Sequence, residues 1–380
     1  MRRRVWRRAL ATLCLGGLAC GPATRAGHLV AAASPELVDV TLLLIGDAGA
    51  PAAPPDSEPV LMALRAAAAA ASHPFIVFLG DNVYPRGLPD SGAPDRPEAE
   101  RRLTAQIAVL RATGARGMFV PGNHDWDKQA AGGWDAVRRQ GRFIAAAGLR
   151  LLPGDGCPGP AVVDVGQAVR IVALDTQWWL DDGPKPQDPT SSCPADSRAE
   201  VIDSLRASLA TAAERVVVVV AHHPLLSSGP HGGHFGWKDH LFPLRAAKSW
   251  LWLPLPLIGS AYPIARKEGI SSQDESSAAY RAMRSAFDSA FHDRPPLIYA
   301  AGHEHALQVI TGTSARYVLV SGAGIFGHTE PVAMREGMRY ARSASGFMRV
   351  DVLRDGRARL GVMVVNRAGI AAEAYSLWLN

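Results

Sequence analysis

The sequence has little excess charge of either sign outside its first residues. It contains 40 Lys and Arg against 35 Asp and Glu, a formal net charge of +5. The first twenty residues contain no acidic residue but carry five arginines: Arg2, Arg3, Arg4, Arg7 and Arg8. Without them the net charge is 5 − 5 = 0. A neutral chain argues against a protein that binds nucleic acid through a basic surface, so we expect no nucleic-acid partner.

The apolar segment that follows these arginines is too short to cross a membrane. It runs from Ala9 to Ala19, whereas a spanning helix needs about 20 apolar residues. A basic start, a short apolar stretch and small residues after it are typical of an export signal, which we place at residues 1–20. We therefore expect an exported protein with a small-residue linker over 21–35 and a folded domain over 36–380.

The export signal can end in two ways. Gly17-Leu18-Ala19-Cys20 is similar to a bacterial lipoprotein cleavage site, although Gly17 stands where a bulky aliphatic residue is usual. In that case Cys20 becomes a lipidated N-terminus that anchors the protein to a membrane. Thr24-Arg25-Ala26 fits ordinary cleavage before Gly27 instead, which gives a periplasmic or secreted protein. The residues alone leave both open.

Cysteine is scarce, with 4 in the whole chain. Cys14 and Cys20 belong to the signal, which leaves Cys157 and Cys193 in loops rich in Pro, Gly and Ser. In an oxidising compartment, two loop cysteines most simply form a disulfide. The alternative is that both stay unpaired.

The chain shows no internal repeat and no domain-sized linker. Its 380 residues are 48% hydrophobic, which suffices for one elaborated α/β domain with a substantial core. Helix and strand patterns alternate, and two strands flank Asp355-Gly356, a strong hairpin signal. The pattern predicts an α/β fold with two packed mixed β-sheets flanked by helices. The expected strands are Val38–Ile45, Phe75–Leu79, Met118–Val120, Ala161–Val165, Arg170–Leu174, Val216–Val220, Tyr317–Val320, Phe347–Leu353 and Ala358–Val365, and the expected helices are Ser57–Ala71, Glu98–Thr113, Trp134–Ala147 and Ser197–Ala213.

Five apolar runs each end in residues that can bind a metal. The runs are LLLIGD, FIVFLGD, GMFVPGNHD, VVVVVAHHP and PLIYAAGHEH, and they carry Asp47, Asp81, Asn123 to Asp125, His222 with His223, and His303 with His305. Such runs predict buried parallel strands, and ligands of open α/β sheets gather where these strands end. Carboxylate, amide and imidazole groups suit hard cations, and two cations about 3.5–4 Å apart can clamp a phosphate. The pattern therefore predicts a dinuclear metal site.

The blocks at these strand ends resemble, in order, the motifs of the calcineurin-like metallophosphoesterases. They are Asp47-Ala48-Gly49, Gly80-Asp81-Asn82-Val83-Tyr84, Gly122-Asn123-His124-Asp125, His222-His223-Pro224 and Gly302-His303-Glu304-His305. A downstream segment, Ser321-Gly322-Ala323-Gly324, is also similar to the family. The resemblance implies a four-layer sandwich of two sheets and outer helices that hydrolyses phosphate esters.

Within this superfamily the pattern resembles the purple acid phosphatase branch. Many relatives carry a metal-binding His two positions after the first Asp, where this sequence has Gly49. Tyr84, three residues after Asp81, matches the tyrosine that purple acid phosphatases use instead. A phenolate is a hard anionic donor suited to Fe(III), so the exchange changes the expected metal. The alternative is that Tyr84 is an ordinary loop aromatic.

The resemblance implies a set of ligands for each of two metal ions. The first ion, Fe(III), would be held by Asp47, Asp81, Tyr84 and His305. Asp81 would bridge to a second ion, Fe(II), Zn(II) or Mn(II), completed by Asn123, His222 and His303. Between the two adjacent histidines we choose His222, because the family's ligand stands two residues before the proline.

His124 is the best candidate for a catalytic side chain, because the family's equivalent contacts the phosphate and can protonate the leaving oxygen. The neighbouring Asp125 is expected to fix the tautomer of His124. His231, nine residues after His222, matches the spacing of a second substrate-facing histidine in purple acid phosphatases. Surface or packing roles are expected for the other histidines of the domain: His73, His234, His240, His292 and His328.

The resemblance implies an exported phosphatase that hydrolyses phosphomonoesters by in-line attack of a metal-bound hydroxide. We expect an optimum below neutrality, because a trivalent ion lowers the pKa of bound water further than zinc does. One alternative is a phosphodiesterase or membrane-lipid phosphoesterase on the same site. Another is a non-catalytic, membrane-associated binding protein. The sequence leaves the oligomeric state open.

One insert has an unusual composition. Ser249–Ala265, SWLWLPLPLIGSAYPIA, has no charged side chain and contains three prolines, so a regular membrane-spanning helix is disfavoured. It could be a loop that packs on the core or lines the pocket. It could also be an interfacial wedge, because Trp beside apolar residues suits the membrane–water boundary. Contact with a membrane surface through this insert or through lipidated Cys20 is therefore an expectation.

Overall fold

The computed structural model of the chain describes residues 28–54, 57–187, 189, 191–246 and 250–379. The expected export signal, both cleavage sites and residues 21–27 of the expected linker lie outside the described residues.

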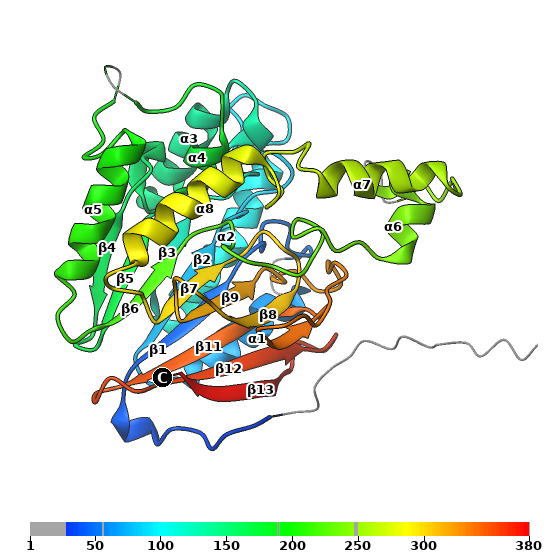
Figure 1. Ribbon diagram of the computed structural model, residues 1–380. Helices are drawn as coiled ribbons and strands as arrows, with labels where there is room; N and C mark the ends of the chain where they lie inside the picture. The colour runs from blue at the N-terminus through cyan, green and yellow to red at the C-terminus, as the bar shows by residue number, and fades with distance from the viewer. Residues whose placement is uncertain (1–27, 55–56, 188, 190, 247–249, 380) are drawn as a thin grey trace, which may run out of the picture.

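Two mixed β-sheets form the centre of the described structure (Figure 1). One has the strand order β13-β12-β11-β1-β2-β3, and the other has the order β10-β8-β9-β7-β6-β5-β4. Within the sheets, β1 to β3 run parallel, as do β5, β6, β7 and β9, and the remaining pairs are antiparallel. The predicted fold class is confirmed. The strands are β1 Val38–Ile45, β2 Pro74–Leu79, β3 Arg116–Val120, β4 Ala161–Val165, β5 Val169–Ala173, β6 Val216–Val220, β7 Ile298–Ala301, β8 Leu307–Thr311, β9 Tyr317–Ser321, β10 Met338–Arg342, β11 Gly346–Leu353, β12 Ala358–Val365 and β13 Ala371–Leu379.

Alternation along the strands builds two layers of core. Successive side chains of a strand point to opposite faces of the sheet. In β1, Val40, Leu42 and Leu44 join the apolar cluster between the sheets, whereas Leu43 and Ile45 pack toward the helices outside. The helices are α1 Pro59–Ala69, α2 Arg96–Thr113, α3 Gly133–Ala146, α4 Thr176–Leu180, α5 Arg198–Ala210, α6 Trp237–Leu241, α7 Ala261–Lys267 and α8 Ala278–Phe291. Because the apolar side chains fill the space between the sheets and under the helices, polar side chains are found in the loops at the strand ends.

Helix α1 begins later than predicted, and capping residues fix where α1 and α5 begin. α1 begins at Pro59, two residues after the expected start, because Glu58 caps it by accepting a hydrogen bond from the Val60 amide. A proline is tolerated there because the first helical N–H groups have no partner within the helix. α5 begins after Ser197, whose side chain forms a capping box with Glu200. The predicted hairpin between β11 and β12 is present.

The two loop cysteines are bonded to each other. Cys157 and Cys193 form a disulfide whose Cα atoms are 5.6 Å apart, so the predicted pairing is confirmed. Among the described residues, no helix has the length and apolar character needed to cross a membrane.

The apolar insert forms part of an arm and does not pack as a loop on the core. The arm consists of α6, two short 3-10 helices at Pro243–Ala246 and Ile258–Ser260, and α7, and α6 and α7 stand away from the sheets in Figure 1. Most large apolar side chains of its described part are exposed, among them Trp250, Leu257 and Ile258. The core-packing interpretation is therefore wrong for the described part. Among the described residues of the insert, 250–265, Tyr262 alone lines the pocket beside the predicted metal ligands.

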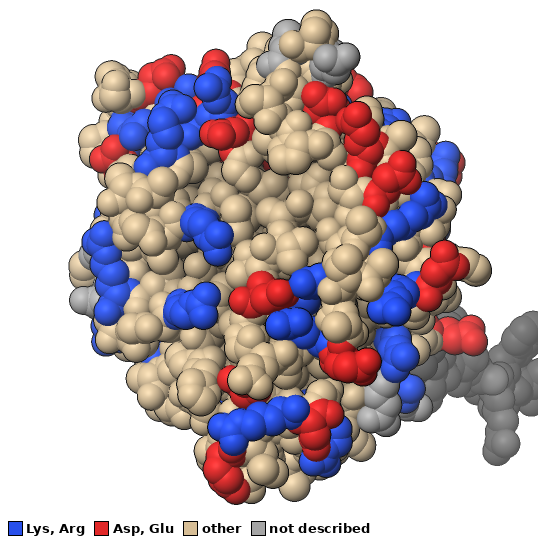
Figure 2. Space-filling model, turned by 90° about the vertical axis from the view of Figure 1, so that its left-hand side faces the viewer, with Lys and Arg blue, Asp and Glu red and all other residues tan. Residues whose placement is uncertain are grey.

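The face shown in Figure 2 mixes both signs of charge. Lys and Arg side chains lie among Asp and Glu side chains there, with uncharged areas between them. That face therefore offers no continuous basic surface of the kind that attracts a nucleic-acid backbone.

Candidate metal centre

Hydrogen bonds join the two sheets at the carboxyl ends of their parallel strands. The backbone N–H of His303, after β7, donates to Asp47 Oδ2, after β1, at 2.8 Å. His222 Nδ1, after β6, donates to the carbonyl oxygen of Leu79 at the end of β2, at 2.9 Å. Gly46 N donates to Ser321 O at 2.7 Å. These bonds bring side chains from both sheets to one place.

Three of the predicted ligands have a backbone conformation that is unusual for their residue type. Asp47, Asp81 and His303 have φ angles of 60°, 54° and 69°, in the left-handed region that favours glycine. Such conformations cost about 1–3 kcal/mol each and persist where the surrounding structure fixes them, often at functional sites. All three side chains point into the same cluster, which indicates that the strain serves the geometry of this cluster.

The predicted ligands of the first metal contact one another. The Tyr84 hydroxyl donates to Asp47 Oδ1 at 2.9 Å and lies 3.1 Å from His305 Nε2. His305 Nε2 is in turn 3.4 Å from Asp47 Oδ1. Asp47 is buried, and Tyr84 and His305 line the pocket.

The predicted ligands of the second metal form an adjoining group. Asn123 Oδ1 lies 2.9 Å from His222 Nε2 and 3.2 Å from His303 Nδ1. Asp81 lies between the groups, with Oδ1 3.4 Å from His222 Nε2 and its carboxylate close enough to act on the Tyr84 hydroxyl. All seven residues predicted as ligands are therefore brought together.

This set of donors fits two metal ions. Ligand atoms that surround one ion at about 2.0–2.2 Å lie about 2.8–3.5 Å from one another, which is the range of these contacts. Ligand atoms of Asp47, Asp81 and His222 lie within 4.8 Å of one another. The chemistry is hard, with carboxylate, phenol and amide oxygens beside imidazole nitrogens, as expected for iron, zinc or manganese.

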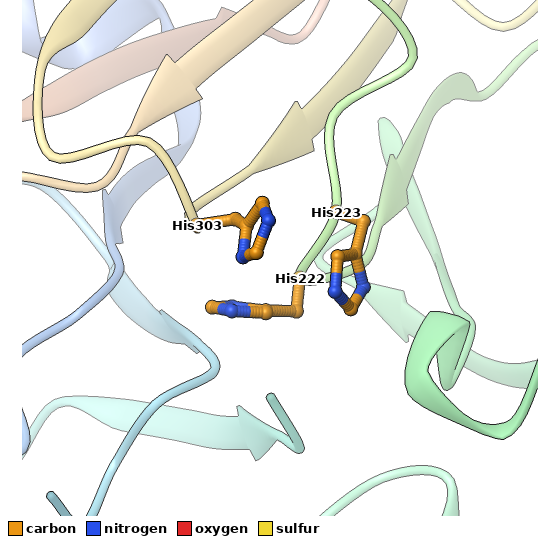
Figure 3. A group of neighbouring side chains, drawn as sticks. All are labelled: His222, His223 and His303. Carbon is orange, nitrogen blue, oxygen red and sulfur yellow. The ribbon is translucent and has the colours of Figure 1, made fainter. Parts of the chain in front are cut away.

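His223 is close to this cluster but faces another way. A ligand atom of His223 lies within 4.8 Å of those of His222 and His303. Both of its ring nitrogens already have partners, Thr176 Oγ1 at 2.8 Å and Gln273 Oε1 at 2.7 Å. Figure 3 shows the rings of His222 and His223 leaving the same loop in different directions, with His303 coming from a separate loop. The hydrogen bonds favour His222 over His223 as the ligand.

Two of the predicted ligands of the first metal, Tyr84 and His305, hold a proton when no cation is bound. Burial and the charges of Asp47 and Asp81 raise the pKa of Tyr84 well above its usual value. Burial lowers the pKa of His305, but Glu330 and Asp47 outweigh it and raise that pKa to about 10. A metal ion must therefore displace a proton from each. By contrast, burial and the neighbouring histidines hold the pKa of His303 well below its usual value, so His303 is neutral, as a ligand must be.

His124 lies at the edge of the cluster and lines the pocket. Its Nδ1 donates to the Pro85 carbonyl oxygen at 2.7 Å, which leaves Nε2 to face Asp81 Oδ2 at 3.6 Å. Burial lowers the pKa of His124, and the charge of Asp81 only partly offsets this. His124 is therefore neutral at pH 7 and gains a proton in acid.

Asp125 does not make the predicted contact with the His124 ring. Its carboxylate accepts hydrogen bonds from the backbone amides of Asn82, Val83 and Gly122 at 3.0, 3.0 and 2.9 Å. The partner of His124 Nδ1 is instead the Pro85 carbonyl oxygen. The prediction that Asp125 fixes the tautomer of His124 is wrong. Asp125 instead ties the loop after β3 to the loop that carries Asp81.

His231 is one of the residues that line this pocket. Its Nδ1 donates to Gln273 O and Asp274 Oδ1, each at 3.1 Å, and its ring centroid is 4.0 Å from that of His303. Burial lowers the pKa of His231, but the hydrogen bond with Asp274 and the charge of Glu304 outweigh it, so the pKa is raised. His231 therefore keeps its added proton to a higher pH than an ordinary histidine does.

The pocket beside the cluster has a volume of about 530 Å³ and contains residues to which the sequence analysis gave no role in binding or catalysis. They are Lys128, Gln129, Tyr262, Arg266, Ser271, Gln273, His328 and Glu330. His328 was expected on the surface or in packing, yet its ring centroid is 4.2 Å from that of His305. The adjacent Ser-rich and Gly-rich loops gave no spacing signal for any of these residues.

The fold and the donor set define a metal-binding α/β protein, and comparison with known proteins assigns its family. The family model described as calcineurin-like phosphoesterase matches residues 40–252, more than half of the chain. The chain therefore belongs to the calcineurin-like phosphoesterase family. No curated protein sequence matches the chain.

Several solved structures share the fold. GAP50, the anchor in the inner membrane complex of Plasmodium, aligns with a TM-score of 0.56 and 15% identity over 90% of this chain and 89% of its own. The purple acid phosphatase PPD1 from yellow lupin (Lupinus luteus) aligns with a TM-score of 0.55 and 13% identity over 88% of this chain. This chain spans 53% of the length of PPD1. PhoD gives a TM-score of 0.52 and 13% identity, with 89% and 69% of the two chains covered.

The two adjacent histidines give a direct test of the ligand set. His222→Ala should lose one of the bound ions, because Nε2 of His222 lies among the donors. His223→Ala should keep both ions but lower the free energy of unfolding by about 2–4 kcal/mol, because it removes a buried ring and one hydrogen bond each from Thr176 Oγ1 and Gln273 Oε1. Metal analysis and denaturant unfolding measure both effects. Loss of metal in His223→Ala alone would contradict the assignment.

Proposed function

We propose that the chain is an exported dinuclear-metal phosphatase of the purple acid phosphatase type that hydrolyses phosphomonoesters. The observation that carries this proposal is the position of the Tyr84 hydroxyl between Asp47 and His305. Its export remains a proposal that rests on the predicted signal over residues 1–20, with Cys20 as the candidate lipid anchor.

The close packing around Gly49 supports a ligand role for Tyr84. A Cβ atom at Gly49 would lie 2.4 Å from the carbonyl oxygen of Asp81 and 2.6 Å from the backbone of Asn82 and Val83. No side chain fits at that position without moving the loop after β2. A histidine two residues after Asp47 is therefore excluded in this backbone, and Tyr84 supplies the remaining donor from the neighbouring loop.

In the proposed centre, each of the two groups of contacting side chains holds one metal ion. Asp47, Tyr84 and His305 with Asp81 would hold Fe(III), for which a phenolate is a suitable hard donor. Asn123, His222 and His303, with Asp81 shared, would hold Fe(II), Zn(II) or Mn(II). Two such ions supply Lewis-acid charge for the phosphate and acidify a water molecule.

Two histidines would act on the substrate. His124 would give a proton from Nε2 to the leaving oxygen, since Nδ1 is already bonded to Pro85 O. His231 would contribute positive charge to the phosphate oxygens from the opposite loop. The exposed mouth of the pocket would admit the ester group.

Two other functions share parts of this support. A phosphodiesterase or membrane-lipid phosphoesterase would use the same donors, and the pocket volume of about 530 Å³ supports this as the second candidate. A non-catalytic, membrane-associated protein is the third, since GAP50 has the same fold and is an anchor in a membrane complex. Matched assays on monoester and diester substrates separate the first two.

Substitution of Tyr84 tests the identity of the first metal. Phenolate bound to Fe(III) gives a visible charge-transfer band, and none of the other proposed ligands does. The purified protein should therefore be coloured, and Tyr84→Phe should lose the band while the fold persists. A colourless wild-type protein that holds two zinc ions by elemental analysis would overturn the iron assignment.

The pH profile tests the role of His124. A proton donor must be protonated, so turnover should fall as pH rises through the lowered pKa of His124, and the optimum should lie below neutrality. His124→Ala should reduce kcat by about 10²–10⁴-fold and remove this limb of the profile. An optimum above about pH 8, with activity restored by manganese or zinc alone, would refute the proposal.

Asn123→Ala separates an enzyme from a binding protein. Removal of the amide oxygen between His222 and His303 should abolish turnover of phosphomonoesters if the centre is catalytic. Circular dichroism shows whether the fold is retained. A wild-type protein with full metal content and no turnover of mono- or diesters would favour the non-catalytic alternative.

A further inference from the structure

Exposed apolar side chains are concentrated in one region of the described chain. Nine of its fourteen exposed large hydrophobic side chains lie between residues 237 and 270. They are Trp237, Leu244, Trp250, Trp252, Leu253, Leu257, Ile258, Ile264 and Ile270. Leu257 is 92%, Ile258 75% and Trp250 70% exposed. Soluble proteins rarely gather so many apolar groups in one place unless a partner covers them.

The arm is built so that these groups stay exposed. α6 packs against both 3-10 helices and α7 within the arm, and the arm stands away from the sheets (Figure 1). Within it, Trp252 packs edge-on against Phe242 at 5.3 Å between ring centroids, and the Arg245 guanidinium lies 4.0 Å from the Trp252 ring. The internal packing leaves Trp250, Leu257 and Ile258 pointing outward.

The composition of the arm matches the boundary between lipid and water. Indole rings favour this boundary because they pair an apolar ring with a polar N–H. Residues 250–265 carry no charged side chain, and the basic groups Lys238, Arg245 and Lys267 flank them, with Asp239 and Glu268 as the adjacent acids. Asp239 is occupied in accepting a hydrogen bond from the Gly236 amide. Exposed apolar residues with basic neighbours are typical of surfaces that insert shallowly between lipid headgroups.

The base of the arm borders the metal pocket. Arg266 of α7 pairs with Asp274, the same carboxylate that accepts a hydrogen bond from His231. Tyr262 and Arg266 line the pocket together with His124 and His305. A surface that receives the arm would therefore lie beside the mouth of the pocket.

We propose that the arm, residues 237–246 and 250–267, docks on the surface of a phospholipid bilayer and holds the metal pocket next to it. A second copy of the chain is the competing occupant of these side chains. The bilayer is favoured because the exposed groups sit on a projecting arm with tryptophans and cations, and not on a flat face that could pair with itself. The docking goes beyond the proposed phosphatase function and does not depend on turnover.

Vesicle flotation tests the docking in the full chain carrying Cys20→Ser, so that no lipid can be attached there. The probes are vesicles of phosphatidylethanolamine with phosphatidylglycerol, and vesicles of phosphatidylcholine alone. The arm variant replaces Trp250, Leu253, Leu257 and Ile258 by Ser. The matched control replaces four exposed apolar residues elsewhere by Ser: Leu29, Met62, Val162 and Ile370. Metal content and circular dichroism confirm that each variant is folded.

We expect the parent and the control variant to float with the vesicles. The arm variant should bind the vesicles at least about tenfold more weakly than the parent. Tryptophan fluorescence of the parent should shift to the blue on vesicle addition, and the arm variant should show a smaller shift. Equal flotation of parent and arm variant would overturn the proposal. So would an absence of flotation together with a parent dimer that the arm variant loses in sedimentation.

Discussion

The hydrogen bonds between the carboxyl ends of the two sheets are the constraint on which the site depends. Asp47 accepts a bond from the backbone of His303, and His222 donates to the backbone of Leu79. Each of these side chains therefore contributes to the joint between the sheets as well as to the donor cluster. Because the apolar core fixes the sheets face to face, donors far apart in the sequence meet in one place without any local motif holding them.

Backbone strain and close packing fix the details of the cluster. Left-handed conformations at Asp47, Asp81 and His303 turn their side chains inward, and the surrounding hydrogen bonds offset their cost. The same crowding leaves no space for a side chain at Gly49. The loop after β2 places the Tyr84 hydroxyl beside Asp47 and His305 instead. In the proposed centre, the lack of space at Gly49 therefore leads to a tyrosine ligand at residue 84, which favours Fe(III).

Apolar periodicity and the motifs at the strand ends were sufficient to predict most of the fold and the residues of the candidate metal centre. The main strands, the two sheets and the seven donors of the cluster followed from runs such as FIVFLGD and from family motifs. α8 was missed although Tyr280, Met283 and Phe287 have helical spacing. The partner of His124 was assigned to Asp125, because sequence adjacency cannot show that an acid is committed to backbone amides. The pocket residues from the arm and from the loop at His328 depend on long-range packing that no local pattern records.

The most direct test of a shared dinuclear centre is anomalous X-ray diffraction from crystals of the metal-loaded protein. The account predicts two anomalous peaks about 3.5–4 Å apart, one beside Asp47, Tyr84 and His305 and the other beside Asn123, His222 and His303, with the Asp81 carboxylate touching both. A single peak beside His223, or metal bound away from these strand ends, would contradict it.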